Sequence, residues 1–355
     1  MTDVRRTPRT AVVTGAAGFL GLACVRELVD RGWDVLALVH RRANPALDAL
    51  CTTGRVRVVR GSITSPSRLE SALGEFARGR RALIHCAGRA TDVGRDRSFR
   101  RANLEGTVNV CRVVEALEIE RLVHVSTTDV YGVGDQAEVR ETAPHRNNRS
   151  NPYPKYKILA EGAVTALLPA SRRVILRPGL VWGPGDVTVL PRVLAFLRSS
   201  PWIVHFGRWR GSNRWPLAYV GNVARVAWGA AHWDDALGEA YNIVDPEPTT
   251  MDGYYRMLAR WFLPEAAERR SLTLPYGVGF LLGAASSTLS ALLDRTHPVL
   301  DPSLYGLQHV AHDQHFCAAK VRDLLARHGE TLVDRETALR ETALRETATA
   351  PDAAR

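Results

Sequence analysis

Two tyrosines and two lysines gather within residues 153–157, in a chain of 355 residues that contains only three lysines. Tyr153 and Lys157 are four positions apart, so on a helix they would share one face. A nearby ammonium favours the ionised form of a phenol, and we expect Lys157 to lower the pKa of Tyr153. Tyr153 could then transfer a proton near neutral pH. Taken alone, the pattern fits a solvated Tyr and Lys at a helix start equally well.

A glycine-rich segment at residues 14–21 is the second motif. The apolar run before it, residues 10–13, predicts a buried strand, and residues 22–29 show the apolar period of a helix. Gly15 would take the tight turn, Gly18 would let the backbone approach a pyrophosphate, and Gly21 would let the helix pack on the strand. The order of strand, turn and helix predicts a dinucleotide site, with an ordinary turn as the alternative.

The end of the second predicted strand, residues 34–39, bears on which dinucleotide binds. NAD sites usually carry a carboxylate there, whereas an arginine suits the extra phosphate of NADP. The strand is followed by His40, Arg41 and Arg42, and Asp34 stands at its beginning. We therefore favour NADP(H), with Arg41 or Arg42 as the phosphate partner, and keep NAD(H) as the alternative.

The composition is that of a globular protein with a large core, at 45% apolar residues. The formal charge of +10 comes from scattered arginines, so it does not indicate a nucleic-acid partner. Five cysteines without paired spacing predict neither a disulfide framework nor a zinc site, and His309, His312 and His315 lack the spacing of a metal cluster. No secretory signal is visible, so we expect a cytoplasmic protein.

Two C-terminal stretches stand apart. Residues 271–293 carry no charge but are diluted by Gly, Pro, Ser and Thr. We expect a helix beside the substrate pocket there, and we favour peripheral membrane contact less. In the tail, the sequence Arg-Glu-Thr-Ala-Leu repeats with a period of five, which places Leu339 and Leu344 on different sides of any helix. We expect residues 333–355 to be disordered.

Between the two motifs, strands and helices alternate as in a doubly wound parallel sheet. Further strands are expected at residues 56–59, 82–85, 122–125 and 174–176. Ligands bind beyond the carboxyl ends of such strands, so the residues that follow them matter. They are Cys86, Ala87 and Gly88, which could lie against a ribose; Ser126, Thr127 and Thr128, which could donate to a substrate oxygen; and the segment 177–186. A turn chosen for its geometry is the alternative for each.

These motifs closely resemble the extended short-chain dehydrogenase/reductase superfamily over residues 10–330. Five occur in the family's order: the glycine turn, residues 103–107, residues 126–132, the Tyr153/Lys157 pair and residues 177–186. The resemblance implies that Thr127 is the catalytic hydroxyl and that Asn103 helps to hold the helix or a water beside Lys157. It also implies that Pro178 and the residues after it approach the nicotinamide. Two positions depart from the pattern, Ser62 and Gly221, where the family often has acidic residues.

The fold that this implies is α/β, a Rossmann domain with a smaller, mainly helical C-terminal substrate-binding domain. We expect the Rossmann domain to cover residues 8–185 and a returning segment at 215–245. The substrate domain would cover residues 186–214 and 246–332. Family resemblance also implies a homodimer formed through paired helices, including the one that carries Tyr153.

The substrate is expected to be small and hydrophobic. Arg214 is one residue from the position at which sugar-nucleotide enzymes of the superfamily place a diphosphate-binding arginine, and that position holds Trp215. Trp182, Trp202, Trp209 and Trp215 could line an apolar pocket, or could build a core. The overall spacing is most similar to the branch of 3β-hydroxysteroid dehydrogenases and 2-alkyl-3-oxoalkanoate reductases.

The predicted reaction interconverts a secondary alcohol and a ketone, with Tyr153 as acid/base and no metal. The alternatives are a nucleotide-sugar epimerase or dehydratase and a cofactor-sensing protein without catalysis. The predicted catalytic residues are Tyr153, Lys157, Thr127 and Asn103, and the predicted substrate contacts are Thr127, Thr128, Trp182 and Trp215. The predicted cofactor contacts are Gly15, Ala17, Gly18, Phe19, Leu20, His40, Arg41, Arg42, Ser62, Ile63, Cys86, Ala87, Gly88, Val125, Tyr153, Lys157, Pro178, Gly179 and Val181.

Overall fold

A seven-stranded parallel sheet forms the centre of the molecule in the computed structural model, which describes residues 9–41, 44–147, 151–293, 295, 298 and 301–349. The strand order is β12-β7-β5-β4-β1-β2-β3. The strands are β1 (Thr10–Thr14), β2 (Asp34–Val39), β3 (Val56–Arg60), β4 (Ala82–His85), β5 (Arg121–Val125), β7 (Arg173–Pro178) and β12 (Ala240–Ile243). The first six are the strands expected from the sequence, and the doubly wound parallel sheet is confirmed.

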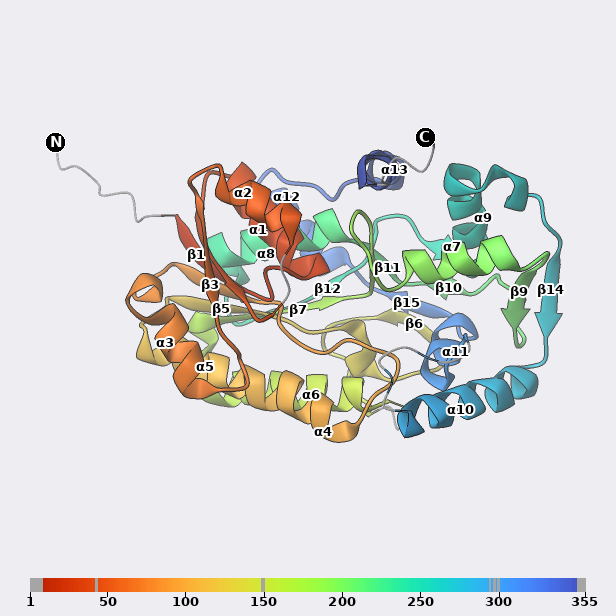
Figure 1. Ribbon diagram of the computed structural model, residues 1–355, viewed down its shortest axis with the longest axis horizontal. Coiled ribbons are helices and arrows are strands. Elements are labelled where there is room, and N and C mark those ends of the chain that lie inside the picture. The colour runs from red at the N-terminus through yellow and green to blue at the C-terminus, as the bar shows by residue number, and fades with distance from the viewer. Residues whose placement is uncertain are drawn as a thin grey trace.

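Helices cover both faces of the sheet, as Figure 1 shows. One face is covered by α1 (Phe19–Asp30), α2 (Pro45–Cys51), α8 (Val220–His232) and α12 (Ala319–Arg327), and the other by α3 (Pro66–Ala77), α5 (Gly106–Ala116) and α6 (Pro152–Leu167). A short helix α4 (Asp96–Phe99) and a π-helical turn (Arg100–Glu105) lead into α5. Strand side chains alternate between the two layers, so Val13 packs with α1 and Val12 with α5.

Beyond the sheet, mostly helical elements surround a second hydrophobic core. The helices of this region are α7 (Leu190–Ser199), α9 (Met251–Phe262), α10 (Tyr276–Leu292), α11 (Leu304–Val310) and α13 (Arg335–Thr349). Helix α10 contributes no described residue to the core and packs on α11. Short strands pair as β8 (Leu180–Trp182) with β11 (Leu217–Tyr219), β9 (Ile203–Phe206) with β14 (Ser271–Leu274), β10 (Arg214–Trp215) with β13 (Thr249–Thr250), and β6 (Gln136–Val139) with β15 (Gln314–Phe316). Among the described residues, no helix is both long and apolar enough to span a membrane.

The expectation of a disordered tail is wrong for its described part. Residues 335–349 form helix α13, which lies near the C-terminus in Figure 1. Leu339 is buried in the second core, whereas Leu344 is 70% exposed. The two leucines do point in different directions, and Leu339 of the first repeat docks the helix together with buried Ala338. Asn222 adds a clamp, since its side chain bonds both the amide and the carbonyl of Val333.

Candidate active site

The Tyr153/Lys157 pair lies on the first turns of α6, at the carboxyl edge of the sheet. Pro152 occupies the first helical position, and the side chain of Asn151 caps the helix by accepting a 2.7 Å hydrogen bond from the amide of Tyr153. The amide group of Asn151 in turn donates to the carbonyls of Thr91 and Asp92. The helix start is therefore fixed to the loop after β4, which holds Tyr153 in position.

Lys157 is buried and reaches the end of β5. Its Nζ donates a 2.7 Å hydrogen bond to the carbonyl of Val125. Burial lowers the pKa of Lys157 to about 8, although Cys86 and Glu161 act in the opposite direction. An ammonium this poorly solvated interacts strongly with any charge that develops nearby.

The expectation that Lys157 lowers the pKa of Tyr153 is not met in this structure. Nζ of Lys157 is 6.0 Å from the centre of the Tyr153 ring and is directed to Val125. Burial and then the negative charge of Asp129 raise the pKa of the Tyr153 phenol, and a hydrogen bond with Thr127 only partly opposes them. Tyr153 is therefore held in its protonated, proton-donating form.

Thr127 and Thr128 lie where the sequence placed them, directly after β5, and both are buried. Thr127 caps a short 3-10 helix, Thr128–Tyr131, by accepting a hydrogen bond from the amide of Asp129 at 3.2 Å. Since Thr127 also hydrogen-bonds Tyr153, its hydroxyl and the phenol can meet the same substrate oxygen.

Asn103 lies in the π-helical turn and is tied to the loop after β4. It accepts a 2.7 Å bond from the amide of Arg89 and donates a 2.9 Å bond to the carbonyl of the same residue. A Cβ on Gly88 would be 2.9 Å from Oδ1 of Asn103 and 3.9 Å from Nζ of Lys157. Asn103 thus fixes the loop that runs beside Lys157.

The glycine turn has the geometry of a dinucleotide site. Gly15 has a φ of +71°, and a Cβ there would be 2.9 Å from the backbone of Ala87, whereas a Cβ on Gly21 would be 2.1 Å from the carbonyl of Gly15. Gly18 caps α1, and a Cβ on it would meet only the Gly15 carbonyl, at 3.1 Å. The turn therefore needs glycine for its own packing and leaves the helix N-terminus open to a pyrophosphate, which fits a dinucleotide cofactor.

The other predicted cofactor residues lie at the same edge of the sheet. Ala17, Phe19 and Leu20 belong to the turn and the start of α1, Val125 ends β5, and Pro178 ends β7. Cys86 and Ala87 follow β4 and lie beside the turn, with the amide of Ala87 bonded to Thr14. Gly179 leads into Val181 on β8, and a Cβ on it would be 2.1 Å from the carbonyl of Pro216.

A basic cleft of about 730 Å³ lies at the ends of β2 and β3. Its walls combine guanidinium and hydroxyl groups with one imidazole. They are His40, Arg41, Arg60, Gly61, Ser62, Ser67, Arg68, Ser71 and Ala72. Arg42 lies outside the described residues. Ile63 does not line this cleft and packs against Gly106. Asp34 pairs with Arg55 at the far end of β2.

Trp182 and Trp215 are core residues, which corrects their prediction as substrate contacts. Trp182 has no exposed surface, and its Nε1 donates to Asp245 at 2.7 Å. Trp215 is 7% exposed and packs edge-on against Tyr254. Arg214 points the other way, as expected on a strand, and its guanidinium is bonded to Asp313. The Arg214 guanidinium is therefore already paired with a carboxylate of the chain itself.

Several functional neighbours were missed by sequence reasoning. Asp129 accepts a hydrogen bond from the Tyr305 hydroxyl and lies 3.9 Å from Nε2 of His309. Asp129 belonged to a recognised motif, but Tyr305 gave no signal because it is far away in the chain. A second missed feature is the buried ion pair of Glu161 with Arg177, at 2.7 Å. Glu161 follows Lys157 by four residues, so helical spacing could have indicated it.

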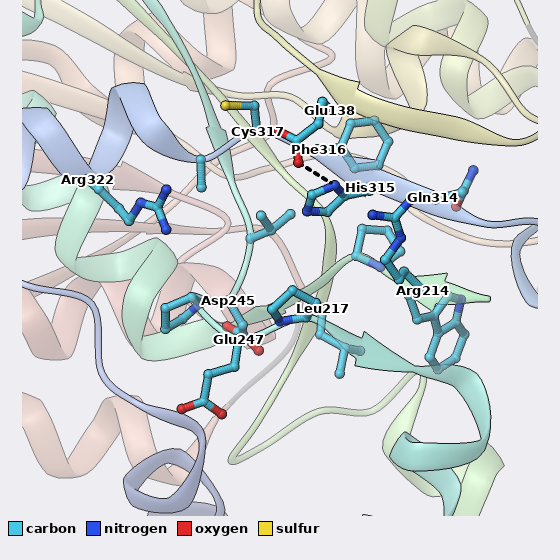
Figure 2. Close-up of a pocket in the computed structure, with 16 residues that line it drawn as sticks. Glu138, Arg214, Leu217, Asp245, Glu247, Gln314, His315, Phe316, Cys317 and Arg322 are labelled. Atoms are coloured by element: carbon cyan, nitrogen blue, oxygen red, sulfur yellow. Dashed lines mark ion pairs between the residues drawn. The ribbon is translucent and has the colours of Figure 1, made fainter. Parts of the chain in front are cut away.

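A smaller pocket of about 100 Å³ lies near β10, β15 and the end of β12 (Figure 2). Its charged walls include Arg214, Glu247 and Arg322, and His315 pairs with Glu138 at 2.9 Å. Neither Tyr153 nor Lys157 lines it. Among the described residues, no three His, Cys, Asp or Glu side chains are grouped as a metal site would require.

Residues 11–244 match the model described as the NAD dependent epimerase/dehydratase family, and the chain belongs to that family. It is 32% identical over 295 residues to a 2-alkyl-3-oxoalkanoate reductase of Shewanella oneidensis, covering 79% of this chain and 73% of that protein. It is 30% identical over 256 residues to a 3β-hydroxysteroid dehydrogenase/Δ5→4-isomerase of Mycobacterium tuberculosis, covering 69% and 67%.

A solved dTDP-glucose 4,6-dehydratase of Bacillus anthracis in complex with NAD has the same fold. Its TM-score is 0.69 at 18% identity, over 96% of this chain and 97% of that one. Family and relatives together identify the chain as an oxidoreductase of the extended short-chain dehydrogenase/reductase superfamily that uses a nicotinamide dinucleotide.

Proposed function

We propose that this protein interconverts a ketone and a secondary alcohol on a steroid-like or long-chain 3-oxo substrate, with NADP(H) as its preferred cofactor. The observation that carries the proposal is the convergence of three groups at the carboxyl end of β5. They are the Tyr153 phenol, the Thr127 hydroxyl and the ammonium of Lys157. The relatives named as reductases and hydroxysteroid dehydrogenases support the class of substrate.

In the reducing direction, Thr127 and Tyr153 hold the substrate oxygen by hydrogen bonds. When bound, the nicotinamide supplies the hydride. Negative charge then develops on the substrate oxygen, and Tyr153, which burial keeps protonated, donates its proton there. The Lys157 ammonium, held by the carbonyl of Val125, supplies a fixed positive charge beside the reacting groups. In the oxidising direction the same groups act in reverse.

The preference for NADP(H) rests on the basic cleft at the ends of β2 and β3. Arg41 and Arg60 are exposed there, and Ser62 adds an uncharged hydroxyl to the same cleft. Arg41→Ala should raise the KM for NADPH at least about tenfold and leave the KM for NADH nearly unchanged. Arg55→Ala is the matched control, because Arg55 pairs with Asp34 at the other end of β2. Equal KM values for both cofactors in the unmodified protein would refute the preference.

The substrate class is tested by the absorbance of reduced nicotinamide. Long-chain 2-alkyl-3-oxo acids should be reduced with NADPH, or 3β-hydroxysteroids oxidised with NADP⁺, whereas UDP-glucose should be neither bound tightly nor converted. Conversion of the sugar nucleotide alone would favour the epimerase. Cofactor binding without turnover of any compound would favour a cofactor-sensing protein. The engagement of Arg214 by Asp313 argues against a diphosphate handle.

We also propose a homodimer that pairs the outer face of α6. Leu159 is 45% exposed there, and Gly162 and Ala166 beside it let a second helix approach closely. Light scattering should give twice the chain mass, and Leu159→Glu should give a monomer.

A further inference from the structure

Helix α10 has its small residues inside and its large apolar residues outside. The face toward α11 is formed by Gly279, Gly283, Ser286 and Ser290, all buried. A Cβ on Gly283 would be 3.0 Å from the amide nitrogen of Leu304, and one on Gly279 would be 2.8 Å from Leu307. Polar groups serve this contact as well, since the hydroxyl of Ser287 accepts a 3.0 Å bond from the amide of Leu304.

The outward face carries several large apolar side chains. Leu281 and Leu292 are 72% and 77% exposed. The other exposed apolar residues of this face are Val278, Phe280, Leu282, Leu289 and Leu293. An ordinary surface helix turns such residues toward the core and its polar residues toward water. Helix α10 does the reverse near its two ends, whereas the exposed positions between them hold Ala285 and Thr288.

The most exposed leucines of α10 do not fit the pocket role that the sequence suggested. Figure 1 shows it along the outer edge of the molecule, and its inner side is occupied by α11. Leu281 and Leu292 face outward, so they cannot enclose a substrate beside Tyr153. The described residues leave this apolar face uncovered.

We propose that the outward face of α10 docks onto the surface of a lipid bilayer, with the helix lying in the plane of the interface. The area favours a bilayer over a second copy. A helix of 17 residues is about 26 Å long and about 10 Å wide. Its outward side therefore covers on the order of 300 Å², whereas a stable dimer buries about 800 Å² on each partner. A bilayer needs no complementary partner surface, because acyl chains adapt to the leucines.

The charge of the chain fits the same partner. No charged residue occurs from Ser271 to Leu293, while exposed Arg270 and Arg295 stand on either side of that stretch. The whole chain carries a formal charge of +10. Exposed Trp202 precedes β9, the strand that pairs with β14, and β14 leads into α10. Arginine and tryptophan beside an apolar surface suit the headgroup layer of an anionic membrane. The docking does not depend on the proposed catalytic function.

Sedimentation with sucrose-loaded vesicles tests the proposal on the full chain. Vesicles of equal parts phosphatidylcholine and phosphatidylglycerol should carry the protein down. The double variant Leu281→Glu/Leu292→Glu should bind at least about tenfold more weakly, because two carboxylates replace the most exposed leucines of the face. Leu344→Glu is the matched control, since this leucine is 70% exposed but lies on α13 and not on α10. The Leu344→Glu variant should bind vesicles like the unmodified protein.

Circular dichroism and the rate of ketone reduction on a short, water-soluble substrate show whether the double variant is folded and active. The proposal is overturned if the unmodified protein stays in the supernatant. It is equally overturned if the double variant binds vesicles as tightly as the unmodified protein. It is also overturned if the double variant turns a dimer into a monomer in light scattering while no protein binds vesicles. In that case the occupant of the face is a second copy.

Discussion

The ammonium of Lys157 lies 2.7 Å from the carbonyl oxygen of Val125, so α6 is joined to the end of β5 by a buried charge. This contact places the ammonium at the edge of the sheet where ligands bind and leaves it 6.0 Å from the Tyr153 ring. The lysine is therefore a fixed positive charge beside the reacting groups.

Ketone reduction should lose rate above about pH 8. Burial lowers the pKa of Lys157 to about 8, so the ammonium is lost above that pH, whereas the raised pKa of Tyr153 keeps the phenol protonated. We expect kcat/KM for reduction to be level from neutral pH to about 8 and then to fall up to about tenfold per pH unit. Lys157→Met should be slow at every pH and lack this fall. A plateau that continues to pH 10 would refute the assignment.

The same shift affects stability with a defined sign. The pKa of Lys157 is about 8 in the folded chain against an ordinary value of 10.5, so the unfolded chain binds more protons between these values. The free energy of unfolding should therefore gain from this group as pH rises through that window. Urea unfolding should show the gain in the unmodified chain and not in Lys157→Met.

Glu161→Gln should destabilise the protein by about 3 kcal/mol or more, because it leaves Arg177 buried without its carboxylate. Burial opposes ionisation of Glu161, but hydrogen bonds from His145 and Arg177 hold its pKa at about 2. The ordinary value is 4.5, so this stabilisation should be lost as pH falls from 4.5 toward 2. Glu336→Gln breaks the exposed pair with Arg340 and should cost under about 0.5 kcal/mol. Similar costs for both variants in urea unfolding would contradict the prediction.

The tail offers a matched pair of leucines. Leu339→Ala should cost about 2 to 4 kcal/mol, because Leu339 is buried in the second core. Leu344→Ala removes an exposed side chain at the equivalent position of the next repeat and should change stability by under about 0.5 kcal/mol. Thermal unfolding of both variants measures the difference. Equal effects would mean that α13 is not docked.

The fold and the positions of the main site residues could be predicted because they depend on local sequence. Consecutive residues form a strand, a turn that needs Gly15 and Gly21, and a helix. The four-residue spacing of Tyr153 and Lys157 likewise depends only on helical geometry. Parallel strands then bring the segments that follow them to one edge.

What could not be predicted depends on tertiary contacts. The electrostatic environment of Tyr153 is set by burial and by Asp129, and spacing alone cannot show that Lys157 turns to Val125 instead. An apolar Trp182 has the same sequence signature in a core as in a pocket. The direction of α10 is also invisible in its sequence, because the small residues that face α11 are small only for the sake of close packing.

The most direct test of the account is the rate of hydride transfer in a single turnover with Tyr153→Phe. Tyr156→Phe is the control, since Tyr156 lies on the same helix but bonds Asp96 instead of a substrate. We predict that Tyr153→Phe binds NADPH normally and loses at least about a hundredfold in rate, while Tyr156→Phe stays within about threefold of the unmodified protein. A Tyr153→Phe enzyme that transfers hydride at the unmodified rate would contradict the assignment of Tyr153 as the proton donor.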